Sequence, residues 1–252
     1  MTKVLSIASQ KGGTGKTSTA LSLAAGLARQ GKAVLLIDID SQANASKVLL
    51  PHYQTEIRKD DTLYRTIIQR QPLAIHKTSI PNLEVVPSHI LLSDTDVVLT
   101  TALDHREARL REQLDAVKGR FDYVFVDCPP ALGWLSINAF TASDEAIVVI
   151  SPGYFELEST IQIGKTIQEV QKDFNPSLRL RGFLFTMSDP TVNSRTSLKL
   201  LRQTYPEFVL QTVIPRNVDL KDASFNKQDI FLYAPRSKAA EAYAKVLEEL
   251  FP

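Results

Sequence analysis

The stretch SQKGGTGKTSTALS, residues Ser9–Ser22, decides the fold of this 252-residue chain. It follows an apolar run at Lys3–Ser9 and leads into a segment at Thr17–Gln30, whose Ala/Leu pattern predicts a helix that ends at Gly31. A strand, a glycine-rich turn and a helix in this order form the setting that a phosphate-binding loop requires. We therefore predict a phosphate-binding loop directly after the first strand.

The loop departs from the usual pattern in one place. The pattern G-x-x-x-x-G-K-[ST] is met at Gly15, Lys16 and Thr17, but Gln10 takes the place of the first glycine, and a second lysine, Lys11, follows it. Lys16 is placed for the β- and γ-phosphates of a nucleotide, and the Thr17 hydroxyl for a magnesium ion. The loop glycines let backbone N–H groups point at phosphate oxygens, and the N-terminal end of the following helix adds positive potential.

Composition and charge narrow the class of protein. The chain is 44% hydrophobic and 23% charged with a formal net charge of +1, so a nucleic-acid partner would need a local basic patch. Its one cysteine, Cys128, excludes an intramolecular disulfide framework and fits a reducing compartment. No apolar run approaches the roughly 18 residues of a membrane-spanning helix. We expect a soluble, cytoplasmic protein with no membrane partner.

Short, mostly continuous apolar runs alternate with helical patterns along the chain. Continuous hydrophobicity is typical of strands buried on both faces, and strand–helix alternation predicts a mostly parallel sheet. The predicted fold class is α/β, a twisted sheet with helices on both faces, in a single domain over residues 1–252. The predicted strands are Lys3–Ser9, Ala33–Ile39, Phe121–Asp127, Glu145–Ser151 and Arg181–Met187, with weaker candidates at Leu83–Ser88 and Phe208–Pro215.

Acidic residues stand at the carboxyl ends of two predicted strands. Asp38 and Asp40 end the run LLIDID, and Asp127 ends the run YVFVD. Ligands of open parallel sheets bind beyond these ends, so the acids should converge on the loop. A single strand-end Asp is more commonly a helix cap or a turn residue, but three of them beside a phosphate loop favour metal and water handling. We expect Asp127 to hold Mg²⁺ and Asp38 to orient or activate the attacking water.

Three motifs together resemble the deviant Walker A ATPases of the ParA/MinD family: KGGTGKT at Lys11–Thr17, DIDSQ at Asp38–Gln42, and DCPPALG at Asp127–Gly133 with Asn138 beyond it. The resemblance continues through TVIPRNVDL and YAPRSKAA, and so covers essentially the whole chain. It implies a P-loop NTPase fold, ATP and Mg²⁺ as cofactors, and a homodimer that forms with ATP. Lys11 would be the signature lysine that reaches the nucleotide of the second subunit, which links nucleotide state to association.

The resemblance also implies roles for single residues. Lys11, Lys16 and Asp38 would be catalytic, Asp40 would begin the first switch, and the DCPPALGW segment would form the second. No arginine finger is evident, so slow hydrolysis is expected. The implied nucleotide contacts are Gly12, Gly13, Thr14, Gly15, Lys16, Thr17, Ser18, Met187 and Pro215, the last two beside adenine, and the implied Mg²⁺ site comprises Thr17, Asp40 and Asp127.

Branches of the family can be compared by what this sequence lacks. Iron proteins of the nitrogenase type need paired cysteines for their cluster, which Cys128 alone does not supply. MinD-like proteins end in a basic amphipathic helix, whereas Glu248 and Glu249 lie near the end of this sequence. The larger ParA proteins carry an N-terminal helix-turn-helix domain, whereas the first predicted strand here begins at Lys3. A short ParA type is expected, similar to ParA/Soj or to the carboxysome-positioning McdA; a MinD-like, membrane-associated or assembly-regulating ATPase stays the alternative.

A short ParA type is linked to non-specific binding of double-stranded DNA, and hence to the nucleoid. The segment from Arg181 to Lys238 contains nine Lys/Arg against five Asp/Glu, and part of it, Asn193–Tyr205, predicts an amphipathic helix. Three basic residues alone more often mark a solvated helix face, and the family context favours DNA. Leu198, Leu201 and Tyr205 should face the core, and the expected DNA contacts are Arg195, Lys199, Arg202, Lys221 and Lys227.

Several positions depart from the family pattern. Ser41 stands where the family usually has proline, and Asp219 and Ser224 lie in a segment, RNVDLKDASFNKQDI, that often reads RNVRLSEAPSxGxPI. Trp134, the one tryptophan, lies in the second-switch region, where smaller aliphatic residues are usual. These departures affect the DNA contacts and the choice of adaptor, for which a ParB-like or a McdB-like protein is expected.

Overall fold

The computed structural model describes residues 2–252, with the backbone alone described at residues 154–157 and 159. Its centre is a seven-stranded sheet in the order β3-β4-β2-β5-β1-β6-β7, in which every neighbouring pair is parallel except β3 and β4. The strands are β1 (Lys3–Ala8), β2 (Val34–Asp38), β3 (His76–Lys77), β4 (Leu83–Val86), β5 (Tyr123–Asp127), β6 (Glu145–Ile150) and β7 (Arg179–Phe185).

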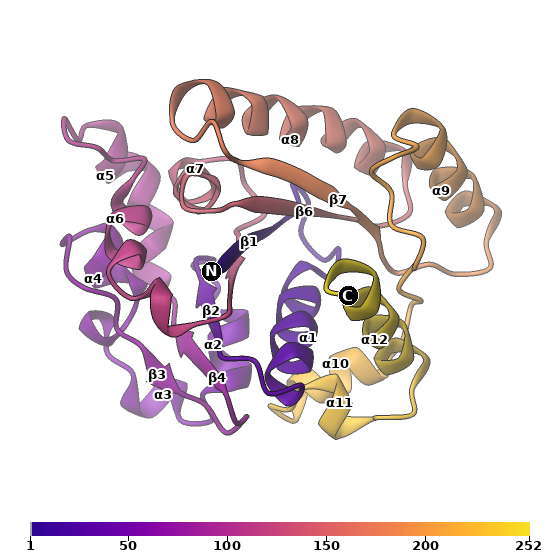
Figure 1. Ribbon diagram of the computed structural model, residues 1–252, viewed down its shortest axis with the longest axis horizontal. Helices are drawn as coiled ribbons and strands as arrows, with labels where there is room; N and C mark the ends of the chain where they lie inside the picture. Colours follow the sequence, from indigo (N-terminus) through magenta and orange to yellow (C-terminus); the bar gives the residue numbers. More distant parts are fainter. Residues whose placement is uncertain (1) are drawn as a thin grey trace.

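The helices lie in two layers, one on each face of the sheet (Figure 1). α1 and α12 cover one face, and α7 and α8 cover the other. The helices are α1 (Lys16–Arg29), α2 (Asn44–Leu49), α3 (Tyr53–Glu56), α4 (Leu63–Ile67), α5 (Thr95–Thr100), α6 (Arg109–Asp115), α7 (Trp134–Thr141), α8 (Tyr154–Asp173), α9 (Val192–Thr204), α10 (Asp219–Phe225), α11 (Ile230–Tyr233) and α12 (Lys238–Leu250), with 3₁₀ turns η1 (Lys59–Asp61), η2 (Ile90–Asp94) and η3 (Lys118–Arg120).

The continuous apolar runs follow from this layered arrangement. In β1, Leu5 and Ile7 belong to the core cluster under α1 and α12, whereas Val4 and Ala8 belong to the cluster under α7 and α8. Successive side chains of a strand point to opposite faces, so a strand covered on both faces is apolar at most positions, and a buried polar residue such as Ser6 of β1 bonds to a partner, here the Ser143 hydroxyl. The α/β class with helices on both faces is therefore confirmed.

α1 packs closely against the C-terminal helices. A Cβ atom on Gly26 would lie 2.3 Å from Leu247 Cδ1 and 3.2 Å from Phe231 Cε2, so only glycine allows α12 and α11 to approach α1 this closely. This contact packs α1, the helix that follows the loop, against α11 and α12 near the end of the described chain. Among the helices of residues 2–252, none is both long and apolar enough to cross a membrane.

Six of the seven predicted strands are present within one or two residues of their expected bounds, including the weaker candidate at Leu83–Ser88. The strand expected at Phe208–Pro215 is wrong. This segment runs beside β7 but forms only isolated bridges, between Phe183 and Val209 and between Ser188 and Pro215. Between these bridges the N–H groups of Gln211 and Thr212 donate to the carboxylate of Glu249, at 2.7 and 3.0 Å, which interrupts the ladder.

Candidate active site

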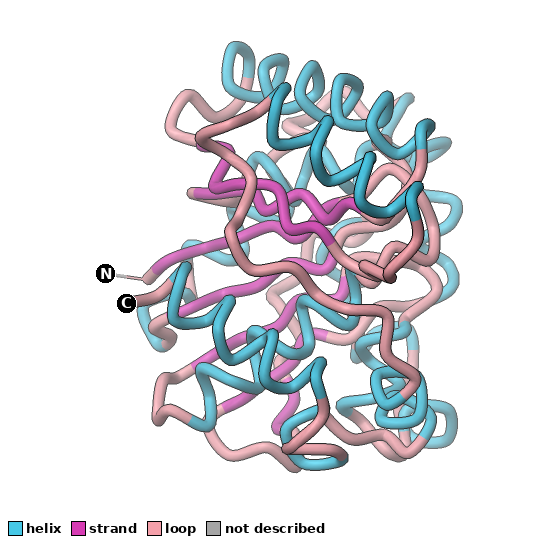
Figure 2. The backbone as a smooth tube through the Cα atoms, turned by 90° about the vertical axis from the view of Figure 1, so that its right-hand side faces the viewer, coloured by secondary structure: helices cyan, strands magenta, loops and turns pink. Residues whose placement is uncertain are grey.

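The predicted phosphate loop connects β1 to α1, at the edge of the sheet where β1, β2 and β5 end. Figure 2 shows this edge opposite the two labelled ends of the chain. Gly13 and Gly15 have φ angles of 77° and 87°, a left-handed conformation in which a side chain is strained. α1 then begins at Lys16 with no side-chain cap and no acidic residue in its first turn. Its N-terminal N–H groups and positive end are thus available to an anion.

Lys16 is buried between two carboxylates. Its Nζ lies 3.2 Å from Asp127 Oδ1 and 3.8 Å from Asp40 Oδ2, and only 7% of its side chain is exposed. Burial opposes the charge, but Asp127 and Asp40 outweigh it and raise the pKa of Lys16 above its ordinary value. The ammonium group therefore stays charged at neutral pH, as a phosphate-binding lysine requires.

Asp127 has the features of a metal ligand. Burial raises the pKa of its carboxyl group, while Lys16 and a hydrogen bond from the Thr17 side chain oppose that change. Its second oxygen, Oδ2, is buried without a hydrogen-bond partner. A buried carboxylate oxygen without a partner, beside a threonine hydroxyl, suits Mg²⁺, which takes one or two protein oxygens and fills its other positions with water and phosphate. Thr17 and Asp127 thus fit the ion.

Asp40 lies in the same group but is already bonded. Its Oδ1 accepts a hydrogen bond from Gln42 N at 2.9 Å, and its Oδ2 faces Lys16. Among the side chains that the structure describes, no cluster of three or more His, Cys, Asp or Glu is arranged to hold a metal ion. The metal site that the residues support is therefore sparse, as is usual for Mg²⁺ bound together with nucleotide phosphates.

Asp38 lies beside Asp127 in the pairing of β2 with β5, and its side chain is completely buried. Burial and the charge of Asp127 raise the pKa of Asp38 to about 7, against hydrogen bonds from Ser46 that favour the charged form. Oδ2 accepts from the Ser46 amide at 2.8 Å and from its hydroxyl at 2.7 Å, and Oδ1 accepts from Asp40 N at 3.2 Å. The structure thus brings together all three predicted acids and Lys16.

The residues expected near adenine also meet the loop. Thr186, at the end of β7, donates its hydroxyl to Thr14 O at 2.6 Å, and a Cβ on Gly15 would lie 4.0 Å from Met187 Cε. Met187 has a φ of 52°, which turns the chain directly after β7. Ser188 pairs with Pro215 in a parallel bridge, so the two segments lie side by side next to the loop.

The remaining loop residues differ in exposure. Lys11, Gly12 and Gly13 are exposed, Thr17 and Ser18 are half-buried, and Thr14 is buried with its hydroxyl oxygen unpartnered among the described residues. The exposed side of the loop is the side that another molecule can reach. Lys11 lies on this exposed side.

The second-switch segment is attached to α5 and to the loop that follows it. The N–H of Trp134 donates to Asp96 Oδ1 at 2.8 Å, and its indole Nε1 donates to the Thr100 hydroxyl at 3.3 Å. The guanidinium of Arg106 lies 4.1 Å from the centre of the Trp134 ring. A Cβ on Gly133 would lie within 2.5 Å of the Asp96 carboxylate, so a side chain at this position would displace Asp96 from its hydrogen bond to the Trp134 N–H.

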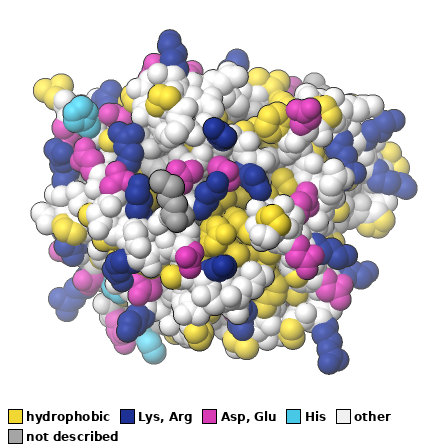
Figure 3. All heavy atoms as spheres, viewed as in Figure 1, with side chains coloured by type: hydrophobic (Ala, Val, Ile, Leu, Met, Phe, Trp, Pro, Cys, Tyr) yellow, Lys and Arg dark blue, Asp and Glu magenta, His cyan; other side chains and the backbone are white. Residues whose placement is uncertain are grey.

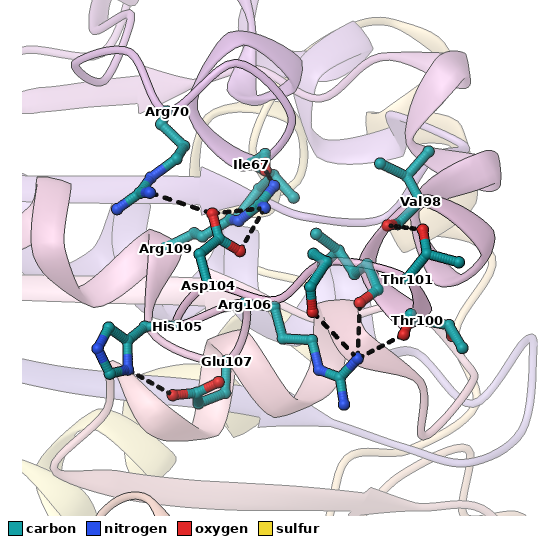
Figure 4. Close-up of polar contacts among 12 residues, drawn as sticks. Ile67, Arg70, Val98, Thr100, Thr101, Asp104, His105, Arg106, Glu107 and Arg109 are labelled. Carbon is teal, nitrogen blue, oxygen red and sulfur yellow. Dashed lines mark hydrogen bonds and ion pairs between the residues drawn. The ribbon is translucent and has the colours of Figure 1, made fainter.

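Arg106 holds this segment to the end of α5. Its Nη1 donates to the carbonyl oxygens of Leu99 and Thr100, at 3.0 and 2.6 Å (Figure 4). In the same view Arg109 donates to Asp104 and to the Ile67 carbonyl, which fixes the following loop to α4. Asp96, Arg106 and Ser46 were not anticipated from the sequence, because a polar residue on a short helix or loop gives no local signal of its partner.

The predicted basic helix is present as α9. Leu201 is buried and Leu198 and Tyr205 are half-buried, as expected for the inner face. Figure 3 shows Lys and Arg side chains gathered at the edge of the molecule over α9. The three basic residues there are all exposed, and Arg202 also donates to Gln211 O at 3.1 Å: they are Arg195, Lys199 and Arg202.

The other two expected DNA contacts lie on or after α10, well away from α9 (Figure 1). Lys221 and Lys227 are exposed, but Asp219 and Asp222 share α10 with Lys221. The Nζ of Lys227 donates to Pro51 O at 2.6 Å, which joins this segment to the residues after α2. Of the two basic groups, the one on α9 therefore forms the more coherent surface.

Comparison with known proteins gives matches along the whole chain. A family model described as AAA domain matches residues 2–180. The sporulation initiation inhibitor protein Soj of Bacillus subtilis is 39% identical over 256 residues, covering 99% of this chain and 98% of Soj. The chromosome partitioning protein ParA of Myxococcus xanthus is 35% identical, covering 98% of this chain and 87% of that protein.

Solved structures agree with this match. A cobyrinic acid a,c-diamide synthase from Mycobacterium smegmatis with bound ADP and magnesium is 31% identical with a TM-score of 0.82, covering 98% of this chain and 93% of that one. MinD of Pyrococcus horikoshii with Mg-ADP is 26% identical with a TM-score of 0.80, covering 100% and 96%. McdA of Cyanothece, 24% identical with a TM-score of 0.84 and coverage of 98% and 100%, shares the fold.

Proposed function

This chain belongs to the ParA/Soj family of P-loop ATPases, and we propose that it is a slow, Mg²⁺-dependent ATPase that dimerises with ATP, binds DNA without sequence preference and positions a cargo. One observation carries the proposal: Lys16, at the uncapped start of α1, is buried and charged against Asp127 and Asp40, beside a loop in which Gly13 and Gly15 have positive φ. Soj and ParA, its similar relatives, are named for sporulation control and chromosome partitioning.

In this proposal the loop binds the phosphates of ATP. Lys16 contributes the charge nearest the β- and γ-phosphates, the backbone N–H groups of residues 12–18 contribute hydrogen bonds, and Met187 and Pro215 border the adenine. Thr17 and Asp127 hold Mg²⁺, with Asp40 beside them, and the bound ion supplies neutralisation of phosphate charge. Lys16 exchanges its carboxylate partners for phosphate when nucleotide binds, so no buried charge is left unpaired.

Asp38 orients the attacking water. Its carboxylate lies at the carboxyl end of β2, next to Asp127 and two residues from Asp40. Burial raises the pKa of Asp38 to about 7, so a substantial fraction of the group is ionised at neutral pH and able to accept a proton from water. Slow turnover is proposed because no arginine finger is evident in the sequence.

Dimerisation and DNA binding follow from exposed residues. Lys11 on the open side of the loop reaches the nucleotide of a second subunit, so that ATP becomes part of the interface. Arg195, Lys199 and Arg202 form the main DNA surface, and Lys221 and Lys227 contribute where the dimer brings them near the duplex. The cargo is a plasmid, a chromosome region or a protein organelle, linked through a ParB-like or McdB-like adaptor that stimulates hydrolysis, and the protein associates with the nucleoid.

A MinD-like function on a membrane surface is the second candidate, because α9 also exposes apolar side chains. Val192 is 71% exposed and Leu200 is 43% exposed beside the basic residues of the helix. Apolar and basic side chains on one helix also suit an anionic bilayer. The MinD structure of Pyrococcus horikoshii shares the fold.

One co-sedimentation experiment separates these functions. The protein is mixed with plain double-stranded DNA or with anionic liposomes, each with ATP and Mg²⁺, with ADP and Mg²⁺, or without nucleotide. We expect ATP-dependent binding to DNA and no binding to liposomes. ATP-dependent binding to liposomes alone would replace the DNA proposal by the MinD-like one, and Lys16→Ala provides the control that cannot use nucleotide.

A further inference from the structure

We propose that Ser46 is a positioning residue for ATP hydrolysis: it fixes one oxygen of Asp38 and leaves the other to accept the proton of the attacking water. This inference rests on the proposed function, because it concerns the same reaction. Ser46 lies outside every motif that the sequence singled out, and it belongs to the first turn of α2, beyond the first-switch residues.

The contacts are directed at one atom. Asp38 Oδ2 accepts two hydrogen bonds from the same residue, one from Ser46 N at 2.8 Å and one from Ser46 Oγ at 2.7 Å. Both residues are 0% exposed, so no water competes for these bonds. Two short bonds to a carboxylate oxygen in a dry site hold the plane of the group as well as its position.

Ser46 is itself held in place. Its hydroxyl oxygen accepts a hydrogen bond from Ser88 N at 2.9 Å, directly beyond the end of β4. The Ser46 hydroxyl donates its hydrogen to Asp38, and its oxygen accepts a hydrogen from the Ser88 amide. The second bond fixes the direction in which the hydroxyl donates. Tyr53 then donates to Ser88 O at 2.7 Å, so that α3, the end of β4, α2 and Asp38 form one chain of hydrogen bonds.

The other oxygen of Asp38 is less engaged. Oδ1 accepts a single hydrogen bond of 3.2 Å, from Asp40 N, and so retains capacity for a further donor. A water that is to be activated needs such an oxygen in a fixed direction, because proton transfer requires a donor–acceptor separation of about 3 Å. Ser46 therefore holds Oδ2 in place, while Oδ1 stays able to accept a proton from the attacking water.

The test compares Ser46→Ala with Ser46→Thr in the full-length protein. Ala removes the side-chain donor, and Thr keeps a hydroxyl at the same place. We expect kcat for ATP hydrolysis to fall about tenfold in the Ala variant and to recover in the Thr variant, which corresponds to the loss of one hydrogen bond to a charged group. The Kd for ATP, measured by equilibrium titration, should remain that of the wild type, because Ser46 is remote from the phosphate loop in sequence and bonds to Asp38 alone within the site.

Ser143→Ala is the matched control. Ser143 is 2% exposed, and its hydroxyl donates to Ala139 O at 2.7 Å before β6, at the opposite edge of the sheet. The Ser143→Ala variant loses a buried hydroxyl of the same kind that does not contact the site. Its kcat should therefore equal that of the wild type if the two proteins are equally stable. Where the Ala variant of Ser46 is insoluble, Ser46→Cys keeps the shape with a much weaker donor and should show the same fall in kcat.

A double-mutant cycle with Asp38→Ala distinguishes positioning from general damage. Because Ser46 acts through Asp38, Ser46→Ala should reduce the single-turnover rate in the wild-type background and have no effect in the Asp38→Ala background. Equal effects in both backgrounds, or a wild-type rate in Ser46→Ala while Asp38→Ala is slow, would overturn the role of Ser46 and leave the proposed function in place. A wild-type rate in Asp38→Ala itself would overturn the role of Asp38, and that of Ser46 with it.

Discussion

Asp38 and Asp127 occupy paired positions on the neighbouring strands β2 and β5, and both carboxyl groups are completely buried. Two acids placed this close in a dry site cannot both be charged without a cation, and Lys16 lies 3.2 Å from Asp127 Oδ1. The charges of the site before nucleotide binds are therefore set mainly by Asp38 and Asp127, at the ends of two strands, and Lys16, at the start of α1.

Asp38 should make the nucleotide-free protein less stable as the pH rises. Its pKa is raised from 3.8 to about 7 in the folded chain, so the unfolded chain loses this proton at lower pH than the folded one does. The contribution of Asp38 to the free energy of unfolding is fully present below the unfolded pKa of 3.8 and is lost as the pH rises through the folded pKa of about 7. Asp38→Asn should flatten the dependence of Tm on pH over this range, measured by thermal unfolding in EDTA. An unchanged slope in the variant would contradict the raised pKa of Asp38 in the folded chain.

Lys16→Ala should abolish ATP binding. The loop would lose its charge toward the β- and γ-phosphates, while Asp127 and Asp40 would remain and repel the nucleotide. Equilibrium titration with a fluorescent ATP analogue measures the effect. Lys172→Ala, on the exposed side of α8, is the control and should bind as the wild type does. Retained affinity in Lys16→Ala would remove the phosphate-loop assignment.

Asp38→Ala should separate binding from hydrolysis. The phosphate loop and Lys16 are untouched, so ATP should still bind, but without a group to orient water its hydrolysis should slow at least a hundredfold. The variant should accumulate as an ATP-bound dimer on size-exclusion chromatography, whereas with ADP it should elute as a monomer. A monomer with ATP, under conditions where binding is saturated, speaks against nucleotide-dependent dimerisation.

The basic face of α9 should carry DNA binding. Replacing Arg195, Lys199 and Arg202 by Ala should weaken ATP-dependent binding and reduce the slope of log K against log salt by about one unit for each lost phosphate contact. ATP hydrolysis without DNA should stay the same, because these residues are exposed on a helix that follows β7. A triple variant at Lys165, Lys172 and Lys245, all exposed on other helices, is matched in charge. An unchanged slope in the α9 variant would contradict DNA binding by α9 and would favour Lys221 and Lys227 as the DNA contacts.

Much of the fold could be predicted because the central strands β1, β2, β5 and β6 are covered on both faces and are therefore mostly apolar. The short edge strand β3, His76–Lys77, is partly exposed and polar, and the sequence did not predict it. The same rule failed at Phe208–Pro215, which is apolar enough for a strand, because its central N–H groups are taken by Glu249 from distant α12. A sequence pattern shows that a segment is able to form a strand, but a side chain from another part of the chain can prevent the strand from forming. The acids Asp38, Asp40 and Asp127 were predictable, since each stands at a strand end.

The residues that hold those acids were not predictable. Ser46 donates to Asp38, and the Ser88 N–H donates to the Ser46 hydroxyl, so only the folded chain brings the start of α2 and the end of β4 to Asp38. Asp96 binds the start of α7 across the space that Gly133 leaves open, a contact between residues far apart in sequence. Which residues form these hydrogen bonds depends on the tertiary structure, and neither residue spacing nor composition predicts it.

Trp134 gives the protein a built-in optical reporter. It is the one tryptophan of the chain, it lies in the second-switch segment, and its ring stacks on Arg106 while its indole N–H donates to Thr100. Any rearrangement of this segment on ATP binding must alter the surroundings of that ring, so the intrinsic emission should shift with ATP and stay constant with ATP in Lys16→Ala. Stopped-flow mixing could then time the ATP-dependent rearrangement of this segment in unlabelled protein, under single-turnover conditions.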